Sequence, residues 1–242
     1  MKGRAALVTG GSSGIGLAIA RALGQDGYSI TLSARRPEKL EEAAEGLRGE
    51  GIELESVPAN MANEEEIAGL VARHKERWGR MDVLINNAGV GIGGTIAEQQ
   101  TKHLDMQLNV NLRAVYLTLR ESIPLLKEAG AEHGKALVVN TASIAGKFGQ
   151  PWLATYSATK HGVVGLTQAA HGELAGDGIQ VTAFCPALVD TPMTDWAKDV
   201  PKEDMIQPAD IAEAVRFLLR TSPACVVPEV QFIRAGDVQT RA

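Results

Sequence analysis

Short apolar runs alternate along the whole chain with longer segments in which apolar residues recur every three or four positions. The short runs are typical of buried strands, and the longer segments are typical of amphipathic helices. The expected strands are AALVT (5–9), SITLSA (29–34), IELESV (52–57), DVLINN (82–87), KALVVNT (135–141), IQVTAFC (179–185) and VPEVQFI (227–233). The expected helices cover residues 14–26, 37–50, 63–78, 100–128, 152–176 and 208–221.

This alternation predicts a single doubly wound α/β domain of Rossmann type, with a parallel seven-stranded sheet and helices on both faces. We found no linker and no low-complexity tract, so residues 1–242 are interpreted as one domain. The segment 187–208, after the sixth strand, interrupts the alternation of strands and helices, because it contains three prolines and many polar residues. Ligands bind beyond the carboxyl ends of the strands in such sheets, so we expect this segment to be a substrate lid.

The composition narrows the class of protein further. The formal net charge of −5 does not favour a nucleic-acid partner, and no apolar run approaches the length of a membrane span. The amino-terminal stretch is too short and too soon interrupted by glycine for a signal peptide. Cys185 and Cys225, the only cysteines, have no metal-type spacing, so we expect a reducing, cytoplasmic setting and no metal.

A glycine-rich turn joins the first expected strand to the first helix. In LVTGGSSGIGLAIARAL, Gly10, Gly14 and Gly16 are spaced as Gly-x-x-x-Gly-x-Gly. Glycine permits a tight turn and close approach of a ligand to the backbone, and the free N–H groups of the following helix favour an anion. The turn therefore predicts a site for the pyrophosphate of a dinucleotide.

The same turn also fits a different reaction class. Residues 10–14 match Gly-x-Ser-x-Gly, the nucleophile elbow of α/β-hydrolases, with Ser12 as the nucleophile. An elbow on the first strand leaves no earlier strand for the oxyanion hole. The last histidine, His171, falls inside an expected helix with no acid suitably placed before it. A serine hydrolase is thus the least favoured interpretation.

Six motifs occur in the order and spacing of the short-chain dehydrogenase/reductase family. They are TGGSSGIG (9–16), NNAG (86–89), NVNL (109–112), NTASIAG (140–146), YSATK (156–160) and PALVDT (186–191). The chain resembles this family over essentially its whole length. The resemblance implies Asn111, Ser143, Tyr156 and Lys160 as catalytic residues.

The chemistry of the Tyr–Lys pair agrees with that role. Tyr156 and Lys160 are four residues apart, on one face of a helix. A positive charge about 4 Å from a phenol lowers its pKa by at most roughly three units from about 10. We therefore expect Lys160 to bring the pKa of Tyr156 toward neutrality, so that Tyr156 acts as general acid and base.

The resemblance assigns roles to the other residues of the set. Lys160 would also hold the ribose hydroxyls of the nicotinamide half, and Ser143 would donate a hydrogen bond to the substrate oxygen. Asn111 would hold a water in a proton relay to the lysine. The simpler alternatives are that Ser143 caps a turn and that Asn111 is an ordinary surface residue.

The end of the second strand indicates which cofactor is used. An acidic residue there would bind the adenosine ribose of NAD, but the matching position is Ala34, followed by Arg35 and Arg36. Guanidinium groups suit a 2′-phosphate, so we expect NADP(H), with Arg35 as the principal contact. The alternative is that both arginines simply begin a solvated helix. Asn60 matches the family position that contacts the adenine amino group.

The remaining site residues also follow from the resemblance. Further cofactor contacts are expected from Ser12, Ser13, Ile15, Met61, Asn87, Ala88, Gly89, Pro186, Val189 and Thr191. A partly apolar substrate pocket is expected from Trp152, Leu188, Met193 and Trp196, beside Ser143 and Tyr156.

These expectations define an NADP(H)-dependent oxidoreductase that interconverts a carbonyl and a secondary alcohol. A 3-oxoacyl thioester or general ketone reductase is favoured over a sugar or steroid dehydrogenase, and a non-catalytic NADP sensor is a further alternative. In this family the helices within 100–128 and 152–176 commonly pair across subunits, so a homodimer or homotetramer is expected. We expect His74, His103 and His133 to be solvated, and Asp82 to order the start of its strand.

Overall fold

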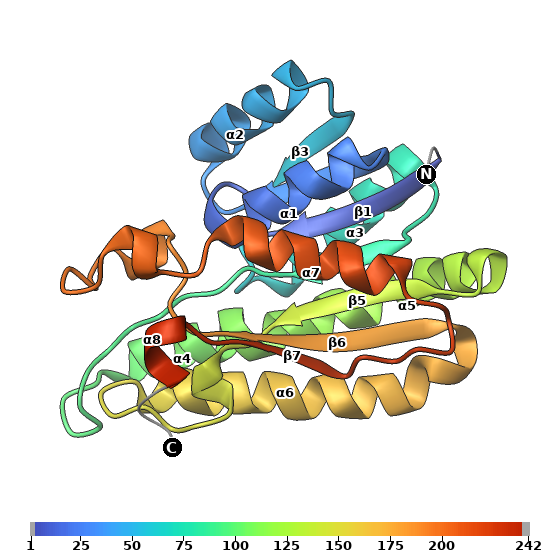
Figure 1. The fold of residues 1–242 in the computed structure, drawn as a ribbon. Coiled ribbons are helices and arrows are strands. Elements are labelled where there is room, and N and C mark those ends of the chain that lie inside the picture. The colour runs from blue at the N-terminus through green and yellow to red at the C-terminus, as the bar shows by residue number, and fades with distance from the viewer. Residues whose placement is uncertain (1–2, 239–242) are drawn as a thin grey trace.

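Seven parallel strands form the centre of the structure, a computed structural model that describes residues 3–238 (Figure 1). The strands are β1 (Arg4–Thr9), β2 (Tyr28–Ala34), β3 (Leu54–Pro58), β4 (Val83–Asn86), β5 (Ala136–Thr141), β6 (Ile179–Pro186) and β7 (Glu229–Phe232). Their order in the sheet is β3-β2-β1-β4-β5-β6-β7. The direction of winding reverses between β1 and β4, which is where ligands bind in doubly wound sheets.

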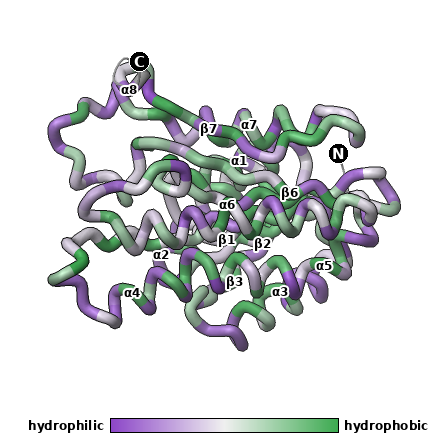
Figure 2. The backbone as a smooth tube through the Cα atoms, turned by 90° about the horizontal axis from the view of Figure 1, so that it is seen from below, coloured by the Kyte–Doolittle hydropathy of each residue, from purple (hydrophilic) through white to green (hydrophobic). Residues whose placement is uncertain are grey.

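Helices cover both faces of the sheet. They are α1 (Gly14–Gln25), α2 (Pro37–Gly49), α3 (Glu64–Trp78), α4 (Thr101–Leu108), α5 (Ala114–His133), α6 (Ala154–Leu174), α7 (Pro208–Arg220) and the short α8 (Ala235–Val238). One apolar core lies between the sheet and α1, α2 and α7, and a second lies between the sheet and α3, α5 and α6. Figure 2 shows hydrophobic colours concentrated in the central elements and hydrophilic colours in the peripheral loops.

Strand residues alternate between these two cores because successive side chains point to opposite faces of a sheet. In β1, Ala6 and Val8 belong to the core with α1, whereas Leu7 belongs to the core with α3. All three side chains are fully buried. This burial on both faces explains why the strand appears in the sequence as a continuous apolar run.

The predicted fold class is confirmed, with every expected strand and helix present. The long helix expected at 100–128 differs in detail, because a π-helical turn at Asn109–Arg113 separates α4 from α5. The expected helix at 152–176 begins only at Ala154, because the backbone of Trp152 has a positive φ of 67°. Residues 1–2 and 239–242 of the expected domain lie outside the described residues.

The prediction that His74 is solvated is wrong. His74 is fully buried between α3 and β2. Its Nε2 lies 2.9 Å from the carbonyl oxygen of Arg80, so Nε2 carries the hydrogen and Nδ1 accepts from the Thr31 hydroxyl at 2.7 Å. Desolvation lowers the pKa of His74 to about 4. The sequence around His74 is polar because the opposite face of α3 is exposed.

The prediction that Asp82 orders the start of its strand is confirmed. The Asp82 carboxylate is buried and accepts a 2.8 Å hydrogen bond from the backbone N–H of Ala5, on the neighbouring strand β1. Arg80 pairs with the same carboxylate at 2.7 Å. These contacts lie at the amino ends of the strands, away from the ligand-binding edge.

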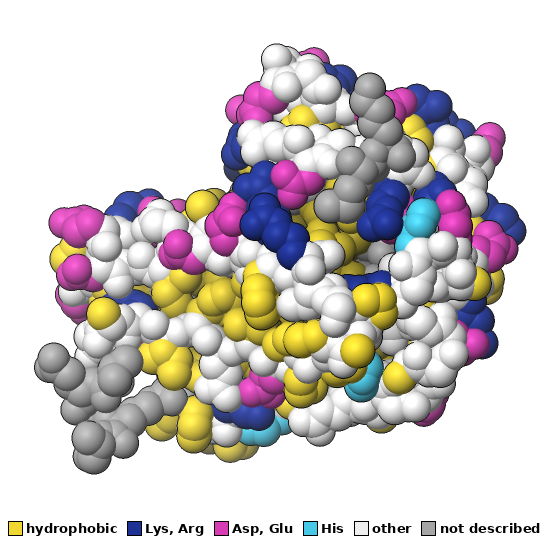
Figure 3. Space-filling model, turned by 45° about the vertical axis from the view of Figure 1, so that its right-hand side comes forward, with side chains coloured by type: hydrophobic (Ala, Val, Ile, Leu, Met, Phe, Trp, Pro, Cys, Tyr) yellow, Lys and Arg dark blue, Asp and Glu magenta, His cyan; other side chains and the backbone are white. Residues whose placement is uncertain are grey.

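The surface carries charges of both signs. On the face drawn in Figure 3, acidic and basic side chains are interspersed around exposed hydrophobic ones. Among the described residues, no helix is both long enough and apolar enough to cross a membrane.

Candidate active site

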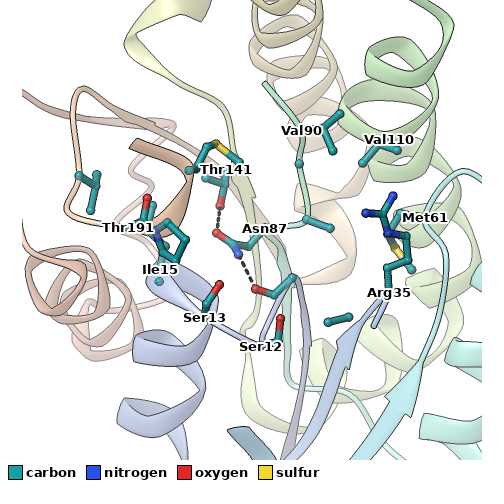
Figure 4. A pocket seen from close by; sticks show the side chains of 18 of the residues that line it. Ser12, Ser13, Ile15, Arg35, Met61, Asn87, Val90, Val110, Thr141 and Thr191 are labelled. Carbon is teal, nitrogen blue, oxygen red and sulfur yellow. Dashed lines mark hydrogen bonds between the residues drawn. The ribbon is translucent and has the colours of Figure 1, made fainter. Parts of the chain in front are cut away.

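A pocket of about 320 Å³ opens at the carboxyl ends of the strands (Figure 4). Its lining comes from the turn after β1, the end of β2, the loops after β3 and β4, the π-helical turn, the ends of β5 and β6, and α6. In Figure 4, Arg35 and Met61 lie at one end of the pocket, and Ile15 and Thr191 lie at the other. The pocket therefore occupies the position that the switch in strand order favours for a ligand.

The glycine turn forms one wall of this pocket. Gly10 and Gly14 have positive φ angles of 66° and 54°, which glycine adopts without strain. A Cβ atom at Gly10 would lie 2.8 Å from the backbone Cα of Ala88. Ser13 is the N-cap of α1, but its side chain makes no capping hydrogen bond, and the first turn of α1 has no acidic residue. The helix N-terminus is therefore available to an anion.

Asn87 holds the glycine turn against β4. Its Nδ2 donates to the carbonyl oxygens of Thr9 and Gly10 at 3.3 and 3.2 Å, and its Oδ1 accepts from the Thr141 hydroxyl at 3.4 Å (Figure 4). Gly16 packs behind this contact, where a Cβ would lie 2.4 Å from the Gly10 carbonyl oxygen. Gly16 does not line the pocket. A glycine is needed at this position because the turn packs closely against it.

The adenosine end of the expected site contains two arginines. Arg35 and Arg36 are exposed and line the pocket, and neither guanidinium pairs with another described residue. Asn60 also lines the pocket, but its Oδ1 already accepts a 3.1 Å hydrogen bond from the backbone N–H of Ala62. Only the second lone pair of that oxygen remains for a ligand.

Tyr156, Lys160 and Ser143 line the same pocket. The Lys160 ammonium is buried and donates a 2.7 Å hydrogen bond to the carbonyl oxygen of Thr141, at the end of β5. Burial lowers the pKa of Lys160 to about 8. Ser143 follows β5, and its hydroxyl donates to the carbonyl oxygen of Pro186 at 3.4 Å.

The expectation that Lys160 brings the pKa of Tyr156 toward neutrality is wrong for this structure. The Lys160 Nζ atom lies 5.6 Å from the centre of the Tyr156 ring and is held by Thr141. Desolvation raises the pKa of Tyr156 above its usual value, and a hydrogen bond with the Ser143 side chain opposes this shift. The sequence argument counted the nearby charge and left out the cost of burying a phenolate.

Ser143 also fulfils the simpler expectation that it caps a turn. Its Oγ atom accepts a 3.1 Å hydrogen bond from the backbone N–H of Ala145 and so caps the 3₁₀ turn Ile144–Gly146. The hydroxyl hydrogen remains available to the pocket, because the bond to Pro186 is long.

Asn111 is fully buried, so the alternative that it is a surface residue is wrong. Its side chain exchanges two hydrogen bonds with the backbone of Val90, at 2.8 and 2.9 Å, and donates to the Thr159 hydroxyl at 3.2 Å. Asn111 is absent from the pocket lining, although Val110 and Val90 on either side of this contact belong to it. The carboxamide thus connects the π-helical turn to the loop after β4 and to α6.

The four residues expected on the substrate side are not gathered in the pocket lining. Met193 lines the pocket, whereas Trp152, Leu188 and Trp196 do not. The two ends of the expected lid are joined by an isolated parallel β-bridge between Val189 and Ile206. It contains two short 3₁₀ turns, Pro192–Thr194 and Lys202–Asp204.

The pocket brings together most of the expected cofactor residues. Those that line it are Gly10, Ser12, Ser13, Gly14, Ile15, Arg35, Arg36, Asn60, Met61, Asn87, Ala88, Gly89, Tyr156, Lys160, Pro186, Val189 and Thr191. Thr9 and Thr141, which hold residues of the site in place, were not predicted. Thr9 accepts from the backbone N–H groups of Asn87 and Ala88, and Thr141 binds both Asn87 and Lys160. Their position as the last residues of buried strands was the available signal.

The serine-hydrolase alternative finds no support in this geometry. Ser12 lines the pocket, but none of the described residues in the lining is a histidine. His171, the candidate base, instead accepts from the backbone N–H of Val181 at 3.4 Å. No group of three or more His, Cys, Asp or Glu side chains among residues 3–238 is arranged to hold a metal ion.

Comparison with known proteins defines the class of this chain. The model of the short chain dehydrogenase family matches residues 4–201. A 3-oxoacyl-[acyl-carrier-protein] reductase of Staphylococcus aureus is 32% identical over 96% of this chain and 97% of its own. The chain therefore belongs to the short-chain dehydrogenase family, as its sequence motifs predicted.

Solved structures of similar proteins carry nicotinamide cofactors. An actinorhodin polyketide ketoreductase variant with NADPH is 37% identical, with a TM-score of 0.87 and coverage of 96% of both chains. A 3-ketoacyl-(acyl-carrier-protein) reductase from Brucella melitensis complexed with NADH is 31% identical, with a TM-score of 0.85 and coverage of 95% and 97%.

Proposed function

We propose that this protein is an NADP(H)-dependent reductase that converts a ketone to a secondary alcohol. The observation that carries the proposal is that Ser143, Tyr156 and Lys160 line the same pocket as the glycine turn. This arrangement combines hydrogen-bond donors for a substrate oxygen with a site for a dinucleotide. The named activities of the relatives, ketoacyl and polyketide ketone reduction, support the same reaction class.

The residues of the pocket fit a phosphorylated dinucleotide. The uncapped N-terminus of α1 at Ser13 suits the pyrophosphate, and Gly14 leaves room for it. The unpaired guanidinium of Arg35 suits a 2′-phosphate, and Ala34 leaves no carboxylate to repel it. The NADPH of the actinorhodin ketoreductase supports this choice, although the Brucella relative was solved with NADH.

When bound, the nicotinamide supplies the hydride that adds to the carbonyl carbon of the ketone. The chain's own residues bind the oxygen of that carbonyl and protonate it. Ser143 donates a hydrogen bond to the oxygen as negative charge develops on it. Tyr156 keeps its phenolic proton at neutral pH, since burial raises its pKa, and transfers that proton to the oxygen.

Lys160 supports this proton transfer through its charge. Its ammonium is anchored by the Thr141 carbonyl oxygen and lies near the Tyr156 ring, where a positive charge stabilises the phenolate that the transfer leaves behind. Its other hydrogens are available to ribose hydroxyls. Asn111, through Val90, fixes the loop after β4, which lines the pocket.

For the substrate we propose a 3-oxoacyl thioester or a related ketone. The pocket side of the lid presents Met193, and the lid also carries the exposed Trp196; these apolar side chains disfavour a strongly polar sugar. A steroid-type ketone of the same apolar character is the second candidate. A non-catalytic NADP sensor is disfavoured by the complete Ser143–Tyr156–Lys160 set.

The decisive assay follows NADPH oxidation against a panel of 3-oxoacyl thioesters, aryl and alkyl ketones, a steroid ketone and sugars. We expect turnover with thioesters or ketones and none with the sugars. NADPH binding without turnover of any compound would contradict the reductase and favour the sensor.

We further propose that the chain acts as one domain, with 187–208 as its substrate lid, in a homo-oligomer. The exposed apolar side chains of Leu104, Leu108 and Tyr116 on α4 and α5 support pairing of these helices between subunits. The two free thiols, Cys185 and Cys225, are compatible with the reducing cytoplasm.

A further inference from the structure

Trp152 has an unusual backbone conformation. It is the one non-glycine residue with a positive φ, at 67°, within residues 3–238. Glycine adopts this conformation without strain, whereas a side chain at this position is strained. Strained residues persist where their surroundings hold them, and they cluster at active sites.

Two contacts hold Trp152 in this conformation. Its carbonyl oxygen accepts a 2.8 Å hydrogen bond from the backbone N–H of Gly94. Its indole ring lies against Gly93, where a Cβ atom would come within 2.1–2.3 Å of three ring carbons. A third contact joins the first turn of α6 to the loop that contains Gly93 and Gly94, since the Thr155 hydroxyl donates to Gln99 Oε1 at 2.7 Å. The loops lie side by side at the lower left of Figure 1.

The same strip of glycine backbone connects Trp152 to the proposed catalytic tyrosine. A Cβ atom at Gly91 would lie 3.9 Å from two carbons of the Tyr156 ring. Gly91 and Gly93 are two residues apart, so their Cα atoms are separated by at most about 7 Å. The phenol and the indole therefore flank one short segment.

The indole is open on its remaining side. Trp152 is 59% exposed and does not belong to the lining of the dinucleotide pocket, whereas Tyr156 does. The tryptophan thus lies beyond the tyrosine, outside the space assigned to the cofactor. Met193, on the lid side of the pocket, is also about half exposed.

We propose that Trp152 is a specificity-determining residue that binds the apolar part of the substrate, and that this part is an aromatic or similarly extended apolar group. The inference rests on the proposed ketone reductase. A glycine at position 152 would adopt this backbone conformation without strain, so the backbone here does not require a tryptophan. An exposed indole against the same glycine segment as the Tyr156 ring provides a large, rigid apolar surface on which an aromatic group can stack.

The test compares Trp152→Gly with the wild type on two ketones, a bicyclic aryl ketone and a four-carbon 3-oxo ester. We expect kcat/KM for the aryl ketone to fall by roughly 10-fold or more, mainly through KM, as loss of an aromatic contact predicts. The value for the small ester should stay within about twofold, because that substrate does not reach the indole. The melting temperature of Trp152→Gly should not fall below that of the wild type.

Two further variants sharpen the comparison. Trp152→Phe keeps a ring and should retain most of the preference for the aryl ketone. Phe217→Ala removes an exposed aromatic residue from α7, a helix that contributes nothing to the pocket lining. This variant should leave kcat/KM unchanged for both ketones.

Each outcome bears on one of the two proposals. Equal effects of Trp152→Gly on both ketones, no effect on either, or a lowered melting temperature with general loss of activity would overturn the role of Trp152 and leave the reductase intact. Absence of NADPH oxidation by the wild type with either ketone, and with the wider panel, would overturn the reductase itself and the inference with it.

Discussion

The ammonium of Lys160 donates a 2.7 Å hydrogen bond to the carbonyl oxygen of Thr141, the last residue of β5. This contact ties α6 to the end of the strand that precedes Ser143. It keeps a buried positive charge near the Tyr156 ring, at a desolvation cost that lowers the pKa of Lys160 to about 8.

The first prediction concerns the pH dependence of the reaction. Tyr156 has a raised pKa and stays protonated through neutral pH. The loss of activity at alkaline pH should therefore follow the deprotonation of Lys160. We expect kcat/KM for ketone reduction to fall as pH rises through about 8. Lys160→Met should lower kcat/KM about 100-fold or more and remove this loss at alkaline pH. A flat profile up to pH 10 in the wild type would contradict the role of the lysine charge.

The second prediction concerns the choice between NADP and NAD. Arg35→Asp replaces an unpaired guanidinium with a carboxylate that repels a 2′-phosphate. The ratio of kcat/KM for NADPH to that for NADH should fall about 10- to 100-fold, as expected for loss of a charged hydrogen bond. Arg36→Asp provides the comparison and should have a smaller effect. An unchanged ratio in Arg35→Asp would exclude Arg35 as the phosphate contact.

The third prediction separates two kinds of glycine. A Cβ at Gly16 would meet the Gly10 carbonyl oxygen at 2.4 Å, so Gly16→Ala must displace the turn that faces the cofactor. We expect weaker NADPH binding and a loss of stability of about 1–3 kcal/mol. Gly69→Ala is the matched control, because Gly69 lies on the exposed face of α3 with nothing within 4 Å of the added methyl.

In the control variant, alanine favours the helix, and the protein should become more stable by about 0.5–1 kcal/mol with unchanged cofactor affinity. Fluorescence titration with NADPH and urea denaturation measure both properties. If Gly16→Ala behaved like Gly69→Ala, the close packing at Gly16 would be unimportant for the turn.

The fourth prediction concerns stability in acid. His74 is neutral in the fold, with a pKa lowered to about 4, and it titrates near 6.5 when unfolded. The unfolded chain therefore binds an additional proton between these values, and protonation favours unfolding. Because of His74, the free energy of unfolding should fall by about 3 kcal/mol as the pH falls from about 6.5 to 4.

Urea denaturation across this pH range measures the loss. His74→Gln removes the group that titrates in this pH range, so the stability of the variant should depend less steeply on pH than that of the wild type. Parallel curves for the two proteins would show that His74 does not have the lowered pKa.

The sequence predicted the fold class and most of the pocket lining because both depend on local patterns. Continuous apolar runs specified buried strands, and Gly10 and Gly14 occupy a turn whose conformation needs glycine. The arginines at positions 35 and 36 were predictable because the residue after the second strand always lies at the carboxyl edge of the sheet.

Other features depend on neighbours that the sequence does not identify. The burial of His74 requires Thr31 and the Arg80 carbonyl, which come from distant segments. The raised pKa of Tyr156 results from desolvation by the whole surrounding fold. The strained backbone of Trp152 depends on Gly93 and Gly94, nearly sixty positions earlier. Such features follow from tertiary packing, which overrides local preference.

The most direct test of the proposed chemistry is the turnover of Tyr156→Phe with a ketone that the wild type reduces. Phenylalanine keeps the ring beside Gly91 and removes only the hydroxyl, so NADPH affinity should stay within about twofold while kcat falls roughly 10²- to 10⁴-fold. If Tyr156→Phe retained more than about a tenth of the wild-type kcat, Tyr156 would not be the proton donor, and the proposed mechanism would be wrong.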